Sequence, residues 1–410
     1  MKIGPNIVTD GLVFGYDTGY PSATNAQSLR FNKGEPVTNL FTTVGNASNV
    51  DQNVTFSVNG TGTFKRVAVG TEIGDYKVKD TDVVYSYELG TNGCHYHGND
   101  YSSVSSGTKV SFSIEYFLTS DVSIVRNYLG NFEQLSGVGG SWGSVNSQTG
   151  VWHKVSFTRT ATSTGNLRML MYPGACGGST LSNQGKIYYK NPTVTLTEHN
   201  VPFVSGTRSS TQGLLDLAGT TDINLTNMSF DSTAQPEMDG TDDYIDLGSD
   251  VEVSSVSNAA SNGWTAEYVF NTDSASTLQH FNGCEEDVHN AGWLALLSSK
   301  LAVWNRDPGV WKYGSTTFAS NTWYHIAFVQ VNGTTMQFYV NGVAEGGDHT
   351  SYSWNAAKSA FFARYIGRYE YGGYSRYFNG HIPVTRLYSK ALTATQIKQN
   401  FNAYRKRFGI

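Results

Sequence analysis

Apolar and polar residues alternate one by one in segment after segment of this chain. Clear cases are residues 109–117, 152–158 and 323–331. Because successive side chains of a β-strand point to opposite faces of the sheet, this period predicts half-buried strands. Clusters of Gly, Asn and Ser separate the segments, and Asn332 followed by Gly333 is a strong hairpin signal. The pattern predicts an all-β chain of antiparallel sheets.

One segment near the C-terminus has the period of a helix instead. Thr393 and Gln396 have the spacing of a capping box. Ile397, Phe401 and Tyr404 then fall on one face of the turn that follows. We expect a single C-terminal helix that packs this face on a sheet.

Length, charge and cysteine content narrow the class of protein. The 410 residues exceed what one sandwich needs, so two domains are expected. The formal net charge of −5 argues against a nucleic-acid partner. The chain shows neither a secretory signal nor an apolar run of transmembrane length, so no membrane insertion is expected. Three widely spaced cysteines form no disulfide framework, which favours synthesis in a reducing cytoplasm.

Breaker residues divide the chain into three parts. Alternation stops at Asn-Pro, His-Asn and Val-Pro pairs between residues 190 and 204, and a second break lies between residues 25 and 37. We therefore expect a domain over residues 37–200, another over residues 201–410 and a separate N-terminal piece, residues 1–36.

Four motifs follow one another along the C-terminal half: residues 238–248 (MDGTDDYIDLG), 321–328 (NTWYHIAF), 336–343 (MQFYVNGV) and 378–397. In this order they resemble the laminin-G-like or concanavalin A-like sandwich modules of phage structural proteins. The ending, residues 399–409, resembles tails of marine phage virion proteins. The resemblance covers about half the chain and implies a β-sandwich, although a fold alone does not give a function.

The N-terminal piece resembles a missing part of the same module. Residues 10–17 are similar to its first strand, which normally continues directly into a stretch like residues 214–217. The resemblance implies two antiparallel β-sandwiches (jelly rolls), with residues 37–200 inserted into a loop of a concanavalin A-like/laminin-G-like sandwich that carries one C-terminal helix. An exposed loop tolerates such an insertion. The insert itself resembles, more weakly, the carbohydrate-binding modules appended to glycan hydrolases.

Aromatic residues are the candidates for binding. Sugar rings stack on the faces of Trp and Tyr, while polar groups bind the hydroxyls. The same residue types are enriched at protein interfaces, so a glycan site and a subunit contact both stay open. The candidates come from a Tyr-rich loop, a Trp-flanked loop and the insert: Tyr369, Tyr371, Tyr374, Arg376, Tyr377, Trp304, Trp311 and Trp142.

Three acids near the first motif are the candidate metal ligands. Laminin-G-like modules often hold calcium at one rim, helped by an acid after a Gly-x-Ile sequence. Pro383 stands at that place here, which departs from the pattern. No cofactor is expected, and a structural Ca²⁺ on Asp239, Asp242 and Asp243 is left open.

Two further clusters have metal-binding residue types without the full spacing. His95 and His97 would share one face of a strand and could bind zinc, but a second Cys or His pair is missing. Residues 284–289 contain acids that could hold calcium. A polar loop is the favoured interpretation of both.

Catalysis is not expected. Glucanases of this fold place acids as Glu-x-Asp-x-x-Glu along one strand, which aims them at the same face. The nearest match starts at Glu237 and Asp239, but Gly240 and Thr241 interrupt the strand.

The resemblance implies a non-enzymatic bacteriophage virion surface protein, either a capsid decoration protein or a component of the neck or tail fibre. Its expected partners are other virion proteins or further copies of itself, with host surface glycan as an additional candidate. It would be made in the host cytoplasm and reside on the virion surface. The alternatives are a free carbohydrate-binding protein and a polysaccharide depolymerase.

Overall fold

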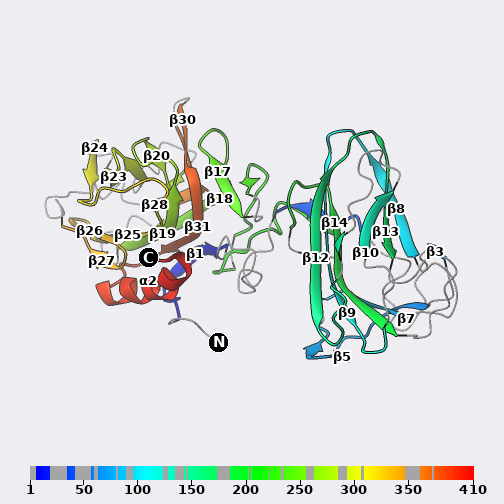
Figure 1. Ribbon diagram of the computed structural model, residues 1–410. Helices are drawn as coiled ribbons and strands as arrows, with labels where there is room; N and C mark the ends of the chain where they lie inside the picture. Colours follow the sequence, from blue (N-terminus) through cyan, green and yellow to red (C-terminus); the bar gives the residue numbers. More distant parts are fainter. Residues whose placement is uncertain are drawn as a thin grey trace. The chain divides into compact units, whose positions relative to one another are not determined.

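A computed structural model provides the structure of the chain. It describes residues 6–18, 35–41, 57–59, 63–79, 82–88, 96–122, 128–133, 143–144, 146–172, 185–201, 203–204, 206–219, 221–231, 235–254, 263–284, 293–305, 309–346, 361–371 and 374–410. As expected from the alternation, these residues form mostly antiparallel β-strands, with a helix near the C-terminus (Figure 1).

The chain divides into two compact units. Residues 1–36 and 209–410 form the split unit, and residues 37–208 form the inserted unit. Strand β2 (Val37–Thr38) pairs with β15 (Thr207–Arg208), so the chain enters and leaves the inserted unit side by side. The inserted unit therefore ends at 208 rather than at the expected 200.

The inserted unit contains two five-stranded antiparallel sheets. In strand β9 (Lys109–Leu118) the alternating residues Val110, Phe112, Ile114 and Tyr116 are buried in its core, as the period predicts. The first sheet has the order β12-β9-β14-β7-β4, in which the other strands are β12 (Trp152–Thr160), β14 (Lys186–Thr195), β7 (Val84–Glu88) and β4 (Thr63–Arg66). The second has the order β11-β10-β13-β8-β3: Gly143–Ser144, Tyr128–Glu133, Gly165–Tyr172, Tyr96–Val104 and Ser57–Asn59. A hairpin, β5 (Glu72–Ile73) and β6 (Tyr76–Lys77), accompanies them.

The split unit is a sandwich built around one eight-stranded sheet. Its order is β16-β17-β31-β19-β25-β26-β27, with β1 also paired to β31. These strands are Ser229–Phe230, Pro236–Asp239, Asn379–Tyr388, Trp264–Thr272, Tyr324–Asn332, Thr335–Val340, Val343–Ala344 and, for β1, Leu12–Asp17.

Two smaller sheets and a hairpin complete the split unit. The three-stranded sheet has the order β18 (Ile245–Ser254), β28 (Phe361–Ile366) and β21 (Asn282–Gly283). The four-stranded sheet has the order β20 (Gln279–His280), β22 (Trp293–Leu297), β23 (Lys300–Asn305) and β24 (Val310–Tyr313). The hairpin consists of β29 (Arg368–Tyr371) and β30 (Tyr374–Tyr377).

The core of the split unit lies between the eight-stranded sheet and the smaller sheets. Trp264 of β19 is fully buried there and stacks on Phe361 of β28, with ring centroids 4.3 Å apart. Leu294 and Leu296 of β22 point into the same core. The smaller sheets are thus covered on the side that faces the eight-stranded sheet.

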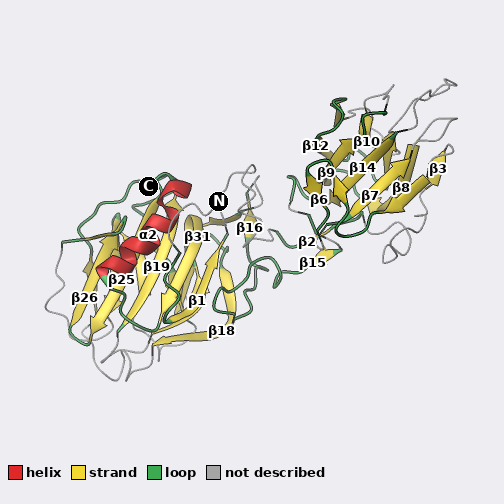
Figure 2. Ribbon diagram, turned by 90° about the horizontal axis from the view of Figure 1, so that it is seen from below, coloured by secondary structure: helices red, strands yellow, loops and turns green. Residues whose placement is uncertain are grey.

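Helix α2 (Ala394–Phe408) covers the opposite, outer face of the eight-stranded sheet. Figure 2 shows it lying across the strands, and Ile397 and Tyr404 pack against residues of β25 and β31. Thr393 accepts a hydrogen bond from the backbone N–H of Gln396, and the Gln396 side chain accepts one from the N–H of Thr393. The predicted capping box is therefore confirmed.

The N-terminal strand β1 belongs to the split unit. It pairs antiparallel with β31, from Leu12 opposite Tyr388 to Asp17 opposite Val384. Phe14 and Tyr16 are fully buried in the core of this unit. The predicted return of residues 10–17 to the sheet of the C-terminal sandwich is confirmed.

Replacing residues 37–208 by a short Gly-Ser linker should leave a folded split unit. Val37 and Arg208 are cross-strand partners, so a short linker spans the gap between the two cut ends. We expect a single cooperative thermal transition by circular dichroism. Deleting residues 1–17 should instead cause unfolding or aggregation, because it removes Phe14 and Tyr16 and exposes the edge of β31. An unchanged melting temperature after this deletion would contradict the nested topology.

Candidate functional site

Three tryptophans lie in a row across adjacent strands of the four-stranded sheet. Trp293 on β22 is directly opposite Trp304 on β23, which is directly opposite Trp311 on β24. Cross-strand partners share one face of a sheet, so all three point to the same side. The rings of Trp304 and Trp311 are 5.3 Å apart between centroids. We call this side of the sheet the tryptophan face.

The tryptophan face is turned away from the core. The residues that alternate with the tryptophans, Leu294 on β22 and Val303 on β23, are buried in the core between the layers. An uncovered face of an antiparallel sheet normally carries polar side chains. Here Trp304 and Trp311 are only half-buried, and Tyr313, on the same face as Trp311, is 41% exposed. Trp293 is buried, so the accessible part of the face consists of Trp304, Trp311 and Tyr313, and an accessible aromatic strip of this kind is typical of a binding surface.

His280 and Tyr369 extend the tryptophan face. His280 on β20 is opposite Ala295, which shares a face with Trp293. The imidazole stacks on the ring of Tyr369 with centroids 4.6 Å apart and an interplanar angle of 18°. Trp293 meets Tyr369 edge to face at 4.5 Å. Tyr369 therefore joins the hairpin β29–β30 to the sheet.

Polar atoms buried beside these rings have no hydrogen-bond partner among the described residues. They are both ring nitrogens of His280 and the indole Nε1 of Trp293. His280 is only 1% exposed. Burial, helped by the positive charge of Arg376, lowers the pKa of His280 to about 3. The imidazole is therefore neutral near pH 7, with one donor and one acceptor nitrogen.

The hairpin β29–β30 presents two different faces. Tyr369 is opposite Arg376, and both share the face that meets the sheet at His280. Arg368 is opposite Tyr377 on the other face, where both line a pocket. Alternate residues of this hairpin therefore contribute to two neighbouring sites, the tryptophan face and the pocket.

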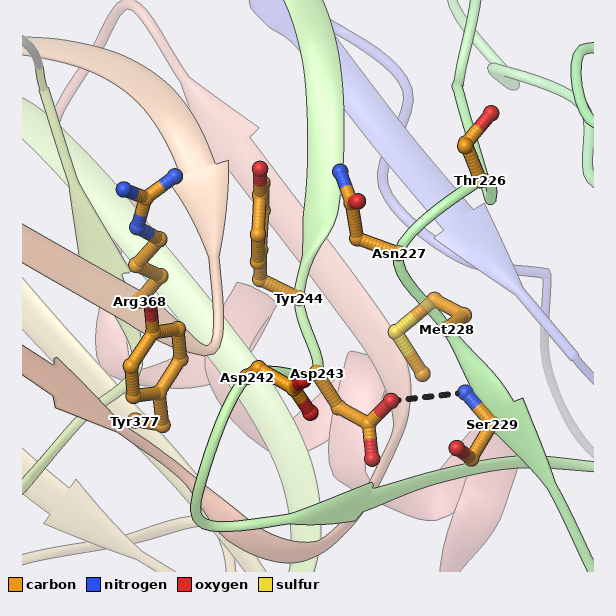
Figure 3. A pocket seen from close by; sticks show the side chains of 9 residues that line it. All are labelled: Thr226, Asn227, Met228, Ser229, Asp242, Asp243, Tyr244, Arg368 and Tyr377. Carbon is orange, nitrogen blue, oxygen red and sulfur yellow. Dashed lines mark hydrogen bonds between the residues drawn. The ribbon is translucent and has the colours of Figure 1, made fainter.

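The pocket on the second face has a volume of about 370 Å³. Figure 3 shows Arg368 and Tyr377 on one side of it and Ser229 on the other, with Asp242 and Asp243 between them. Its complete lining is Thr226, Asn227, Met228, Ser229, Asp242, Asp243, Tyr244, Arg368 and Tyr377.

Arg368 is held rigidly at this pocket. Its guanidinium lies 4.4 Å from the centroid of the Tyr244 ring and 4.7 Å from that of Tyr365. It also forms an ion pair with Glu370. The ring contacts hold the guanidinium against the two aromatic faces, and the ion pair with Glu370 partly neutralises its charge.

The three acids predicted as metal ligands come together at the same pocket. Carboxylate oxygens of Asp239, Asp242 and Asp243 lie within 4.8 Å of one another, a spacing that a Ca²⁺ ion could bridge. Both oxygens of Asp243 accept backbone N–H groups, from Ser229 at 2.8 Å and from Asp239 at 2.9 Å. Burial raises the pKa of Asp243 above its ordinary value, and these hydrogen bonds offset only part of that rise. The acids therefore already stabilise a turn, and calcium binding stays a prediction.

Two of the acids considered for catalysis, Glu237 and Asp239, lie on strand β17, but the third position of the pattern, Asp242, lies beyond the strand. Strand β17 ends at Asp239, and Gly240 follows with a φ of 79°. This left-handed conformation, which favours glycine, turns the chain away before Asp242. The expected interruption of the glucanase-like pattern is present.

The structure separates the residues predicted for binding. Trp304, Trp311, Tyr369 and Arg376 belong to the tryptophan face or its hairpin, whereas Tyr377 lines the pocket. Tyr369 is almost fully buried against His280 and Trp293. Tyr371 and Tyr374 are backbone partners at the end of the hairpin. Trp142, His95 and residues 285–289 lie outside the described residues.

Sequence reasoning missed His280, Trp293 and Arg368. Trp293 begins the run WLALL, which is apolar at every position and so hides which side faces outward. His280 carries no motif, and only the pairing of β20 with β22 brings it to the site. Arg368 was passed over although it stands beside Tyr369 in the Tyr-rich loop.

Comparison with known proteins supports the fold of the split unit. Residues 239–398 match the family model Laminin_G_3, the concanavalin A-like lectin/glucanases superfamily. The split unit is accordingly a concanavalin A-like β-sandwich. No curated protein sequence matches the chain. Among the described residues, no helix is both long and apolar enough to cross a membrane.

Solved structures with a similar arrangement include three proteins of low sequence identity. Domain 4 of AbnA, an extracellular arabinanase of Geobacillus stearothermophilus, is 20% identical and matches 41% of this chain and 75% of that chain, with a TM-score of 0.28. The CBM40 of Ruminococcus gnavus IT-sialidase, bound to alpha2,3 sialyllactose, is 12% identical over 37% of this chain and 95% of that chain, with a TM-score of 0.29. Botulinum neurotoxin type C is 12% identical over 48% of this chain and 50% of that chain, with a TM-score of 0.34.

The buried imidazole of His280 should make the split unit less stable in acid. Its folded pKa of about 3 lies below the ordinary value of 6.5, so between these values the unfolded chain binds a proton that the folded chain does not. The free energy of unfolding should therefore fall by up to about 1 kcal/mol per pH unit as pH drops through this window. His280→Phe, which keeps a ring against Tyr369, should lack this part of the pH dependence.

Urea unfolding at pH 7 and pH 5 measures the effect. The control His153→Gln, in the inserted unit, should keep the wild-type difference between the two pH values. An identical pH dependence in wild type and His280→Phe would mean that the imidazole accepts a proton in the folded protein.

Proposed function

We propose that the split unit is a carbohydrate-binding sandwich that holds a glycan on the tryptophan face. The observation that carries the proposal is the pair of half-buried rings of Trp304 and Trp311, which lie beside the buried Trp293 on the side of the sheet turned away from the core. Flat aromatic rings bind the apolar faces of sugar rings, and neighbouring polar groups bind the hydroxyls.

We further propose that the protein is a non-enzymatic surface component of a bacteriophage virion, in the capsid decoration or in the neck or tail fibre. Its partners would be other virion proteins or further copies of the chain, and its ligand a host surface glycan. The support is the resemblance of residues 378–397 and 399–409 to phage virion proteins. Synthesis in the host cytoplasm and residence on the particle follow from this role. Mass spectrometry of purified particles tests it, because a virion component is recovered at a fixed copy number.

Removing one ring of the tryptophan face should weaken glycan binding. Trp304→Ala and Trp311→Ala should each raise the dissociation constant roughly thirtyfold, corresponding to about 2 kcal/mol for a central aromatic contact. Isothermal titration with a glycan selected on an array measures the change. The control Val343→Ala removes an apolar side chain that is 61% exposed on β27, and should bind as wild type does. Unchanged binding in both tryptophan variants, with the fold intact, would contradict the site.

A depolymerase is the alternative that enzymology can exclude. We expect no release of reducing ends when wild-type protein is incubated with a panel of bacterial and plant polysaccharides. The reason is that the turn at Gly240 separates Glu237 and Asp239 from Asp242, so the acids of the glucanase pattern do not line one strand. Turnover by wild type that disappears in the double variant Glu237→Gln, Asp239→Asn would overturn the non-enzymatic assignment.

A further inference from the structure

The charged side chains around the tryptophan face have one sign. Lys300 on β23 shares a face with Ala302 and Trp304, because each is two residues from the next along the strand. Arg376 on β30 is the cross-strand partner of Tyr369. Among the described residues that the register places on this face and on the adjoining face of the hairpin, these two are charged and both are positive. The chain as a whole has a net charge of −5.

Arg376 is available to a ligand. It is exposed, and no ion pair joins it to an acid of the described residues. The nearest acid along the hairpin, Glu370, alternates to the opposite face and pairs with Arg368 there. Arg376 therefore differs from Arg368, whose charge is already partnered.

The position of Arg376 links it to the aromatic rings. Its partner Tyr369 stacks on His280, and His280 lies 5.9 Å from the ring of Trp311. A ligand stacked on Trp311 thus has the guanidinium at one side. A guanidinium presents a planar fork of N–H donors that matches a carboxylate or a sulfate.

We propose that the glycan held on the tryptophan face is anionic and that Arg376 binds its carboxylate or sulfate group. The inference rests on the proposed function, since it names the class of sugar for the same site. Lys300 stands four residues from Trp304, roughly 13 Å along the strand, which is longer than one sugar ring. The face therefore suits an oligosaccharide with repeated negative charge, whose second acidic group lies toward Lys300.

Matched ligand pairs that differ only in charge test the proposal on the full chain. The first pair is trigalacturonic acid and its methyl ester, and the second is 3′-sulfolactose and lactose. Wild type should bind the charged member of at least one pair about tenfold more tightly, as a hydrogen-bonded ion pair predicts. The pair that shows the preference tells carboxylate from sulfate. The preference should shrink as salt is added.

Variants then assign the preference to a residue. Arg376→Gln should bind charged and uncharged members equally, and Arg376→Lys should keep part of the preference because it retains the charge without the fork. The matched control Arg405→Gln removes an exposed arginine of α2 and should behave as wild type does. Melting temperatures close to that of wild type show that the variants are folded.

The outcomes separate this inference from the proposed function. If wild type binds both members of each pair equally and Trp304→Ala abolishes both, the anionic class is wrong and the glycan site stands. If an array shows no glycan binding at all, the proposed function itself fails. Charged ligands that still bind to Trp304→Ala and Trp311→Ala, but not to Arg376→Gln, would mean that charge alone holds them and that the tryptophan face is not the site.

Discussion

The pairing of β1 with β31 is the contact on which the architecture of this protein depends. Five cross-strand pairs along residues 12–17 return the N-terminal strand to a sheet whose other strands lie beyond the inserted unit. Phe14 and Tyr16 then fill the core, and Tyr16 donates its hydroxyl hydrogen to the carbonyl of Ile382 at 2.8 Å. Closing so long a loop costs conformational entropy that grows only slowly with length, so one well-buried strand can offset it.

A buried amide joins the ends of the chain behind this strand. Asn400 of α2 accepts a hydrogen bond from the N–H of Val8 at 2.8 Å and donates to Glu267 at 2.6 Å and to the Tyr388 hydroxyl at 3.0 Å. It thus ties together the segment before β1, the middle of the sheet and the covering helix. A buried polar network with its partners in place fixes one arrangement, because any shift leaves a costly unpaired group. The helix therefore fixes the outer side of the sheet and leaves the tryptophan face on the other side of the sandwich.

Strand register decides what this sandwich offers to a ligand. The alternation that buries Leu294 in the core turns Trp293 outward beside Trp304. The alternation of the β29–β30 hairpin likewise places Arg376 beside the aromatic rings and Arg368 in the pocket. The residues that fill the core and the residues that form the binding surface thus lie on opposite faces of the same strands. A slip of one residue would exchange them.

The sequence by itself determined the features that are local or periodic. Alternation predicted strand β9 with its inward residues, the spacing of Thr393 and Gln396 predicted the helix start, and the resemblance of residues 10–17 to the first strand of a laminin-G-like module implied the place of β1. It also marked Trp304 and Trp311 as binding candidates. Only the tertiary structure brought His280 and Trp293 to them and set the end of the inserted unit at 208. The physical reason is that pairing between distant strands is decided by the packing of the whole core, which a short uniform run such as residues 293–297 does not encode.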